Sequence, residues 1–423
     1  MAINPVDITL YNYTNYRGDI RGIEFGVTDW LSLTMIFAMF NAKRWQKRTL
    51  YFRSPNEVPM WSYLLLCALT IFTAVVPQFA FFGVTKLLRG YLVFFVALNY
   101  LRNEADARYV VTCAVWISIY SFVQVFLDKY YRGVFPPRGS FEHQNSLAAF
   151  QNLMNFIIFA ALLGDKGKLF AKQNLIYWIG LGGGTLTTLA TLSRGAMATM
   201  IMGYFIVFMG LVVIKAKPTI KKKKWNAVAL MILAALPLLA FLLPPIIDRF
   251  QNAPKESAEA RHTFNDVAAE VGARDFFGIG LNNYSYVGTT EFADVLGVKD
   301  AGGLAHHIYW LSYAELGILG PLLWFLMMAG FVIHIGRTIK RRRHDFEGIL
   351  ALGIMTGFII AMLVGTLEWM FRQTSMLVTY MMLGGFGLSL GRLRESINIQ
   401  NKRSQKIRKA VFAYVLKLNQ HSR

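Results

Sequence analysis

Long apolar stretches alternate with short polar connections along most of the chain. About 20 apolar residues in a helix cross the hydrocarbon core of a bilayer, and a helix satisfies its own backbone hydrogen bonds there. Eleven stretches meet this description, at residues 23–40, 60–77, 84–101, 109–127, 146–163, 175–192, 195–214, 226–247, 308–335, 349–368 and 374–391. The pattern predicts an all-α polytopic membrane protein.

Composition agrees with this class, and the charge distribution orients the chain. Of its residues 55% are hydrophobic, and the net charge is +20. Most Lys and Arg residues fall in alternate connections, at 41–48, 102–108, 164–172, 215–225, 336–345 and 392–423. Cytoplasmic loops of membrane proteins carry such an excess, so these connections are predicted to be cytoplasmic and to lie beside membrane lipids. The charge is therefore not interpreted as a nucleic-acid-binding surface.

This topology divides the chain into four parts. Residues 1–247 hold the N-terminal spans, 248–307 form a long connection away from the cytoplasm, 308–391 hold the C-terminal spans, and 392–423 are a basic cytoplasmic tail. The segment 248–307 is long enough to form a structured cap. Within it, the apolar residues Ala260, Phe264, Val267, Ala268 and Val271 have helical spacing, which predicts an amphipathic helix along the outer membrane face.

An arginine interrupts the longest apolar stretch. Between Leu175 and Ile214, Arg194 is the only charged residue, and this stretch is about twice as long as one span needs. Two spans joined by a tight turn at Arg194 are expected. Such an arginine can simply extend to lipid phosphates, but other cations recur on the same predicted face: Lys86, Arg89, Arg138, Arg261 and Arg372. One guanidinium group can bind two phosphate oxygens at once, so this set of cations suggests a pocket for an anion such as a diphosphate.

Histidines occur just before two of the predicted spans, at the ends that lie on this face of the membrane. His306 and His307 precede the apolar run that contains Gly317 and Gly320, and His143 follows the rigid turn at Pro136-Pro137. Either position is consistent with simple capping of a helix. Adjacent histidines on a helix point about 100° apart, which suits metal binding poorly, and no metal site is predicted. Proton abstraction is the functional alternative.

Several of these stretches together resemble the O-antigen ligase and O-antigen polymerase superfamily of bacterial inner-membrane glycosyltransferases. "TLSRGAMAT" looks like its SRGA-type turn, and "RHTFNDVAAEVGARDFFGIGLNNY" looks like its arginine-led periplasmic helix and G-x-G-x-N segment. "HHIYWLSYAELGILG" is similar to the ligase pattern of His, then Asn, Ser or Gln, nine residues, Gly, two residues and Gly, with His307 departing from it. "GSFEHQNSLAAF" resembles a further motif. The likeness covers residues 130–330 by motif.

The resemblance implies a GT-C-type bundle of about 11–12 transmembrane helices in the bacterial inner membrane, with one large periplasmic loop. It implies transfer of a glycan from an undecaprenyl-diphosphate carrier to an acceptor hydroxyl on the periplasmic side, without metal or other cofactor. The family's usual twelve spans raise the expectation of a further N-terminal helix beyond the eleven. On this sequence His306 would be the catalytic base, Arg194 and Arg261 the diphosphate ligands, and Gly317 and Gly320 structural. Lys86, Arg89, Arg138, His143, His307 and Arg372 are additional candidates.

The sequence does not identify the molecule that accepts the glycan. In ligases it is a sugar of the lipid A core, whereas in polymerases of O-antigen or exopolysaccharide it is another carrier-linked repeat, and a third relative transfers glycan to protein hydroxyls. A transporter of lipid-linked glycan is the alternative from another class. Charges along a transport path would be expected within the spans, but few occur there, Asp29 and Glu368 among them.

Overall fold

The computed structural model describes residues 7–13, 16–46, 49–165, 167–214, 222–230, 255–297 and 302–393, with isolated positions 218, 233 and 247. The predicted span at 226–247 lies outside the described residues from position 231 on, apart from two of those isolated positions. The predicted basic tail lies outside them from position 394 on.

Helices make up nearly all of the described secondary structure. The bundle contains α1 (Val27–Gln46), α2 (Glu57–Leu69), α3 (Pro77–Tyr100), α4 (Glu104–Tyr130), α5 (Gln144–Gly164), α6 (Lys172–Ala190), α7 (Arg194–Val213), α13 (Leu319–Arg341), α14 (Phe346–Val364) and α15 (Thr374–Leu390). Outside it are β1 (Asp7–Asn12), β2 (Gly22–Gly26), α9 (Lys255–Arg274), α10 (Tyr284–Glu291), α11 (Ala293–Leu296), α12 (Ile308–Leu316) and the 3-10 turn η1 (Met370–Arg372).

Six of the described helices, namely α3, α4, α5, α7, α13 and α14, are long and apolar enough to cross a membrane. The helices α2 and α15 are apolar but shorter. The chain is therefore a multi-pass helical membrane protein, which confirms the predicted class at this coarser level. The expected number of eleven spans is not reached among the described helices.

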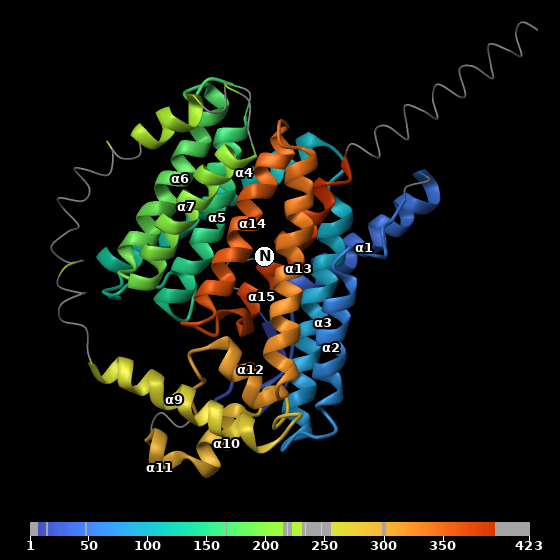
Figure 1. The fold of residues 1–423 in the computed structure, drawn as a ribbon, viewed down its shortest axis with the longest axis vertical. Coiled ribbons are helices and arrows are strands. Elements are labelled where there is room, and N and C mark those ends of the chain that lie inside the picture. The colour runs from blue at the N-terminus through green and yellow to red at the C-terminus, as the bar shows by residue number, and fades with distance from the viewer. Residues whose placement is uncertain are drawn as a thin grey trace, which may run out of the picture.

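In the bundle, helix α5 lies between one group of helices, α4, α6 and α7, and another, α13, α14 and α15. It packs against α4, α6 and α7 on one side and against α14 on the other, while α14 contacts α13 and α15 (Figure 1). Every residue of α5 from Ser146 to Gly164 is buried. Helices α5 and α14 approach closely at Gly353, where an added Cβ would lie 2.5 Å from the Phe156 carbonyl oxygen. Close approach through small residues is the usual means of packing helices in a membrane.

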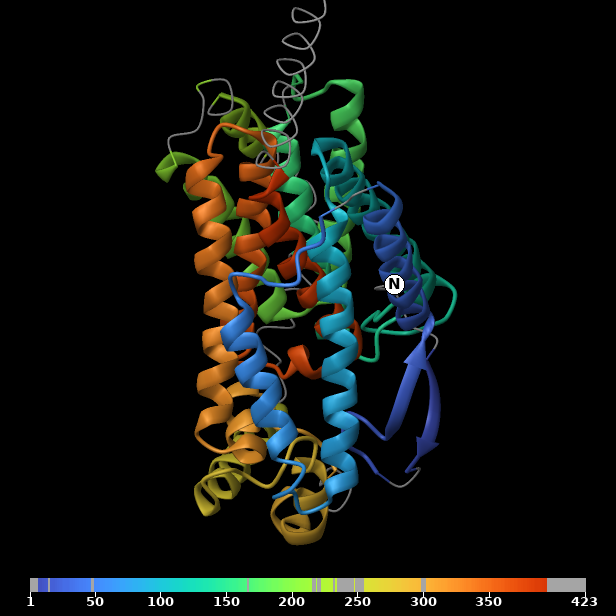
Figure 2. The same cartoon turned by 90° about the vertical axis from the view of Figure 1, so that its right-hand side faces the viewer.

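The helices α9 to α12 gather at one end of the bundle, which we call the cap end (Figure 1). The β1–β2 hairpin lies at the same end (Figure 2). Helix α9 packs on α12 and buries Phe264, Val267, Ala268 and Val271, as the spacing predicts. Ala260 is exposed and does not belong to this face.

Two expectations about the elements are wrong. The stretch at 308–335 is two helices, because the chain breaks at Gly317 with φ 66° and ψ −167°. An added Cβ there would stand 1.7 Å from the Phe276 carbonyl oxygen, so the cap backbone occupies the place of a side chain. The all-α expectation misses the antiparallel hairpin, in which Asp7 pairs with Gly26 and Asn12 with Gly22, and α1 consequently begins at Val27.

Replacing Gly317 with alanine is expected to lower the free energy of unfolding by at least about 2 kcal/mol, because this backbone region costs other residues about 1–3 kcal/mol before any clash. The control is Gly182→Ala in α6, where nothing lies within 4 Å of an added Cβ. There helix propensity predicts a gain of about 0.5–1 kcal/mol. Thermal unfolding in detergent measures both variants, and equal melting temperatures would contradict the role given to Gly317.

Candidate functional site

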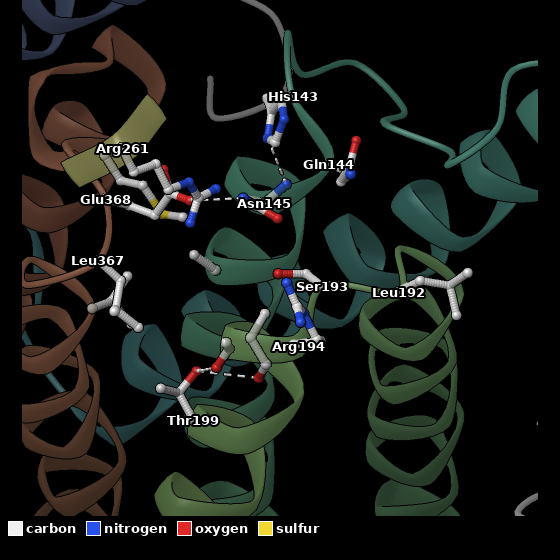
Figure 3. A pocket seen from close by; sticks show the side chains of 15 residues that line it. His143, Gln144, Asn145, Leu192, Ser193, Arg194, Thr199, Arg261, Leu367 and Glu368 are labelled. Atoms are coloured by element: carbon white, nitrogen blue, oxygen red, sulfur yellow. Dashed lines mark hydrogen bonds and ion pairs between the residues drawn. The ribbon is translucent and has the colours of Figure 1, made fainter. Parts of the chain in front are cut away.

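The described residues enclose a pocket of about 330 Å³. Its walls come from the start of α5, the turn between α6 and α7, helix α9 and the segment after α14 (Figure 3). The lining residues are His143, Gln144, Asn145, Ala149, Leu192, Ser193, Arg194, Gly195, Ala196, Thr199, Arg261, Val364, Leu367, Glu368 and Met370.

Arg194 is the first residue of α7, directly after the predicted tight turn. Leu192 makes that turn with φ 53°. The turn is held against α5, since Asn152 donates from Nδ2 to the Ala196 carbonyl over 2.8 Å and accepts at Oδ1 from Thr188 Oγ1 over 3.1 Å. The Arg194 side chain is exposed and lines the pocket (Figure 3).

Arg261 approaches the pocket from α9, whose apolar face is buried in the cap. Its Nη2 lies 3.1 Å from Oε1 of Glu368, and its side chain is 37% exposed. In Figure 3 the two side chains meet on the wall of the pocket that faces Arg194 across the open space. The two arginines are 67 residues apart in sequence and line the same cavity.

His306 is linked to this wall of the pocket by its contact with the Glu368 carboxylate. Its Nδ1 lies 3.3 Å from Oε2 of Glu368, while Asn145 Nδ2 donates to Oε1 of the same carboxylate over 2.7 Å. The Glu368 side chain is 11% exposed. Glu368 therefore binds groups from α9, α5 and the segment before α12. Arg194 and Arg261 line the pocket, whereas His306 is not one of the lining residues and is connected to the pocket through Glu368.

The pKa of Glu368 reflects two opposing effects. Burial raises it, but the hydrogen bond with His306 and the charge of Arg261 outweigh burial, so the pKa lies below its ordinary value. Glu368 is thus a carboxylate at neutral pH. A carboxylate beside Nδ1 holds a proton on that nitrogen, which leaves Nε2 of His306 as the acceptor.

Two helix N-termini add to the positive potential of the pocket. Both α5 and α7 begin at residues that line it, Gln144 and Arg194. The first N–H groups of a helix and its dipole favour anions at this position. His143 caps α5 by accepting from the Asn145 N–H over 3.2 Å, and burial lowers its pKa. With two arginines against one glutamate, the site is suited to an anion.

Three of the additional candidates lie elsewhere. Lys86, Arg89 and Arg372 are buried away from the pocket lining, in ion pairs with Asp19 at 2.8 Å, with Asp29 at 2.9 Å and with Glu315 at 2.5 Å respectively. The prediction that they share the anion pocket is wrong. Their carboxylate partners come from distant segments, namely the connection between β1 and β2, helix α1 and helix α12. Spacing along the chain gives no sign of these pairs.

Arg138 and His307 are also outside the pocket lining. Arg138 is exposed and donates to the Glu142 carbonyl over 3.3 Å. His307 occupies the position just before α12, where its side chain makes no capping hydrogen bond. It packs edge-on against Tyr309, with ring centroids 5.5 Å apart, and burial lowers its pKa. Of the two adjacent histidines, His306 is the one that meets Glu368. At Gly320 an added Cβ would lie 2.4 Å from the Ser312 carbonyl oxygen, so this glycine allows α13 to pack beneath α12.

Sequence reasoning did not assign Glu368 and Asn145 to the site. Glu368 was noted only as a charge in the span predicted at 349–368, but α14 ends at Val364 and leaves Glu368 in the following turn. The sequence signal for Glu368 is a carboxylate at the end of a predicted span, on the same predicted face of the membrane as the arginines. In the described part of the chain, no group of three His, Cys, Asp or Glu residues is placed to hold a metal ion.

No protein-family model matches the chain, and no curated protein is similar to it at a significant level.

The Glu368 pairings predict a pH-dependent stability difference between the wild type and Glu368→Gln. Because the folded-state pKa is lowered, the stabilisation is present above the ordinary glutamate pKa of about 4.3 and is lost as pH falls through the folded value. At pH 7 the variant is expected to be less stable by about 1–3 kcal/mol, the usual range for a charged hydrogen bond.

Thermal unfolding in detergent between pH 7 and pH 3.5 measures this difference. The control is Glu142→Gln, at an exposed glutamate near the site, for which no such dependence is expected. A difference between wild type and Glu368→Gln that stays constant down to pH 3.5 would show that the carboxylate is not stabilised in its ionised form.

Proposed function

We propose that the protein is a membrane glycosyltransferase that moves a glycan from an undecaprenyl-diphosphate carrier to an acceptor hydroxyl at the cap end, the periplasmic side. The observation that carries the proposal is a pocket lined by Arg194, Arg261 and Glu368, with His306 next to it through its contact with Glu368. These groups come from distant parts of a multi-pass membrane protein. They supply both a site for an anion and a base, which a transfer from a diphosphate donor requires.

The arginines are assigned to the diphosphate. Arg194 and Arg261 lie on facing walls of a 330 Å³ pocket, which leaves room for a diphosphate between them. Guanidinium groups stay charged and bind phosphate oxygens through paired hydrogen bonds, and the starts of α5 and α7 add donors of the same polarity. The exposed side chain of Leu367 gives this wall an apolar rim, where a lipid-borne donor can enter from the bilayer.

The His306–Glu368 pair is assigned to the acceptor. Nε2 of His306 takes the proton of the attacking hydroxyl as its oxygen bonds to the anomeric carbon. The bond from that carbon to the diphosphate oxygen breaks, and its electron pair leaves with the diphosphate, whose negative charge the arginines stabilise. Attack opposite the leaving group inverts the anomeric configuration. Glu368 orients the ring and stabilises the imidazolium that forms, at 3.3 Å from Nδ1.

The proposed acceptor is a sugar of the lipid A core, which makes the protein an O-antigen ligase. A repeat polymerase uses the same donor and the same chemistry, so the acceptor alone separates the two. Lipopolysaccharide from a strain that lacks the gene distinguishes them. Loss of all long chains from lipid A core is expected for a ligase, whereas a single repeat unit left on the core would identify a polymerase and overturn the choice of acceptor.

Substitution of the arginines tests the diphosphate assignment. Arg194→Ala and Arg261→Ala are each expected to lower transfer about 100-fold or more, the usual loss for one well-placed charged donor. The assay uses purified protein in detergent with a polyprenyl-diphosphate oligosaccharide and a lipid A core acceptor. Arg138→Ala is the control, an exposed arginine that does not line the pocket, and is expected to keep full activity.

Full activity in both pocket variants would refute the diphosphate site. Transfer in detergent, with no second compartment, would exclude a purely transporting role. A wild-type protein that binds the lipid donor but transfers nothing to any acceptor would contradict the enzyme assignment itself.

A further inference from the structure

Two segments carry the His306–Glu368 pair, and they run side by side with links at both ends. One is α12, directly after His306; the other is the segment from Gly365 to Arg372, which contains Glu368. At one end the Ile308 N–H donates to the Gly365 carbonyl over 2.8 Å. At the other end Arg372 Nη1 donates to Oε2 of Glu315 over 2.5 Å. In each segment the two linked residues are seven positions apart in sequence.

The link between Arg372 and Glu315 is part of a row of four side chains of alternating charge, Lys86, Asp19, Arg372 and Glu315. We call this group the charge quartet. Lys86 Nζ lies 2.8 Å from Asp19 Oδ2, and that same oxygen lies 3.8 Å from Arg372 Nε. The four side chains are at most 6% exposed. Oε1 of Glu315 also accepts from the Tyr284 N–H over 3.3 Å. The quartet is electrically neutral and joins the N-terminal segment, α3, α12 and η1.

An ion pair is a costly way to join two segments if adhesion is all that is needed. Burying charges loses their hydration, and apolar residues of similar volume often stabilise a protein as well or better. What a guanidinium adds is direction, since its planar donors are fixed relative to one another. Arg372 donates from Nη1 to Glu315, and its Nε lies 3.8 Å from Asp19 Oδ2, which is an ion pair but not a hydrogen bond. The bond to Glu315 ties the end of the segment that holds Glu368 to α12.

We propose that Glu315 and Arg372, supported by Asp19 and Lys86, are positioning residues for the His306–Glu368 pair. They hold the segment 365–372 in register with α12, so that the Glu368 carboxylate stays within hydrogen-bond distance of His306 Nδ1. This inference rests on the proposed function, because it assigns the quartet to the geometry of the proposed base.

The chain offers a matched control of the same chemistry. Arg89 binds Asp29 with Nε at 2.9 Å from Oδ1, and the side chains are 9% and 3% exposed. This pair likewise joins α3 to a carboxylate of the N-terminal part of the chain. However, Asp29 lies in α1 and accepts from the Gly26 N–H over 2.7 Å, so the pair does not join α12 to the segment 365–372.

A double-mutant cycle with Glu315→Gln and Glu368→Gln tests the proposal in the full-length protein, with the transfer assay described above. Glu315→Gln alone is expected to lower kcat about 10- to 100-fold, the range for a small misplacement of a reacting group, while KM for the lipid donor changes less than about threefold. In the Glu368→Gln background the same change is expected to lower kcat less than about twofold, since residues that act through one another are not additive.

Asp29→Asn is expected to lower the melting temperature about as much as Glu315→Gln does, with kcat within about twofold of the wild type. Equal losses of kcat in these two variants, or a full Glu315→Gln effect in the Glu368→Gln background, would overturn the proposal and leave the quartet a purely structural feature. If Glu315→Gln does not fold, Arg372→Lys replaces it in the cycle. It keeps the charge but loses the planar guanidinium that meets Glu315, and the same pattern of kcat is expected.

The outcomes separate this inference from the function on which it depends. If the wild type transfers no glycan, or if Glu368→Gln keeps full activity, the proposed site fails. If Glu368→Gln is impaired while Glu315→Gln and Arg372→Lys keep wild-type kcat, the site stands and the positioning role fails.

Discussion

The arrangement of the site depends on one buried carboxylate. Glu368 lies beyond the end of α14 with 11% of its side chain exposed, so its charge needs partners that replace water. Those partners are Arg261, Asn145 and His306, from α9, α5 and the segment before α12. All three partners reach the same two oxygen atoms, so this carboxylate links α9 in the cap to the start of α5 and to the segment before α12.

The two groups of charges on this side of the molecule differ in one respect that bears on function. In the charge quartet at most 6% of any of the four side chains is exposed. In the pocket, by contrast, Arg194 is exposed and the Arg261 side chain is 37% exposed. A sealed group of charges can fix geometry, whereas guanidinium groups that line an open cavity can bind an anionic ligand. The proposed roles follow this difference.

Apolar periodicity predicted the long helices α3, α4, α5, α7 and α14 well, since any segment within a bilayer must satisfy its own backbone. It could not show the break at Gly317, where the obstacle is the carbonyl of a residue 41 positions earlier. The same limit applies to the charges. Arg194 and Arg261 were assigned to one pocket from their predicted side of the membrane, but so were Lys86, Arg89 and Arg372. Which cations are neutralised depends on carboxylates that only the folded chain brings near.

The position of the pocket follows from the same bilayer constraint. Within a spanning helix each N–H is used by a carbonyl of the helix, so unpaired donors remain only in the first turn. The starts of α5 and α7 meet at the pocket, which places these donors and both arginines at the edge of the bundle, not midway along it. In a polyprenyl-diphosphate donor, the charge would lie at the membrane interface and the chain in the hydrocarbon. The site proposed for the donor is thus where membrane helices most readily offer positive charge.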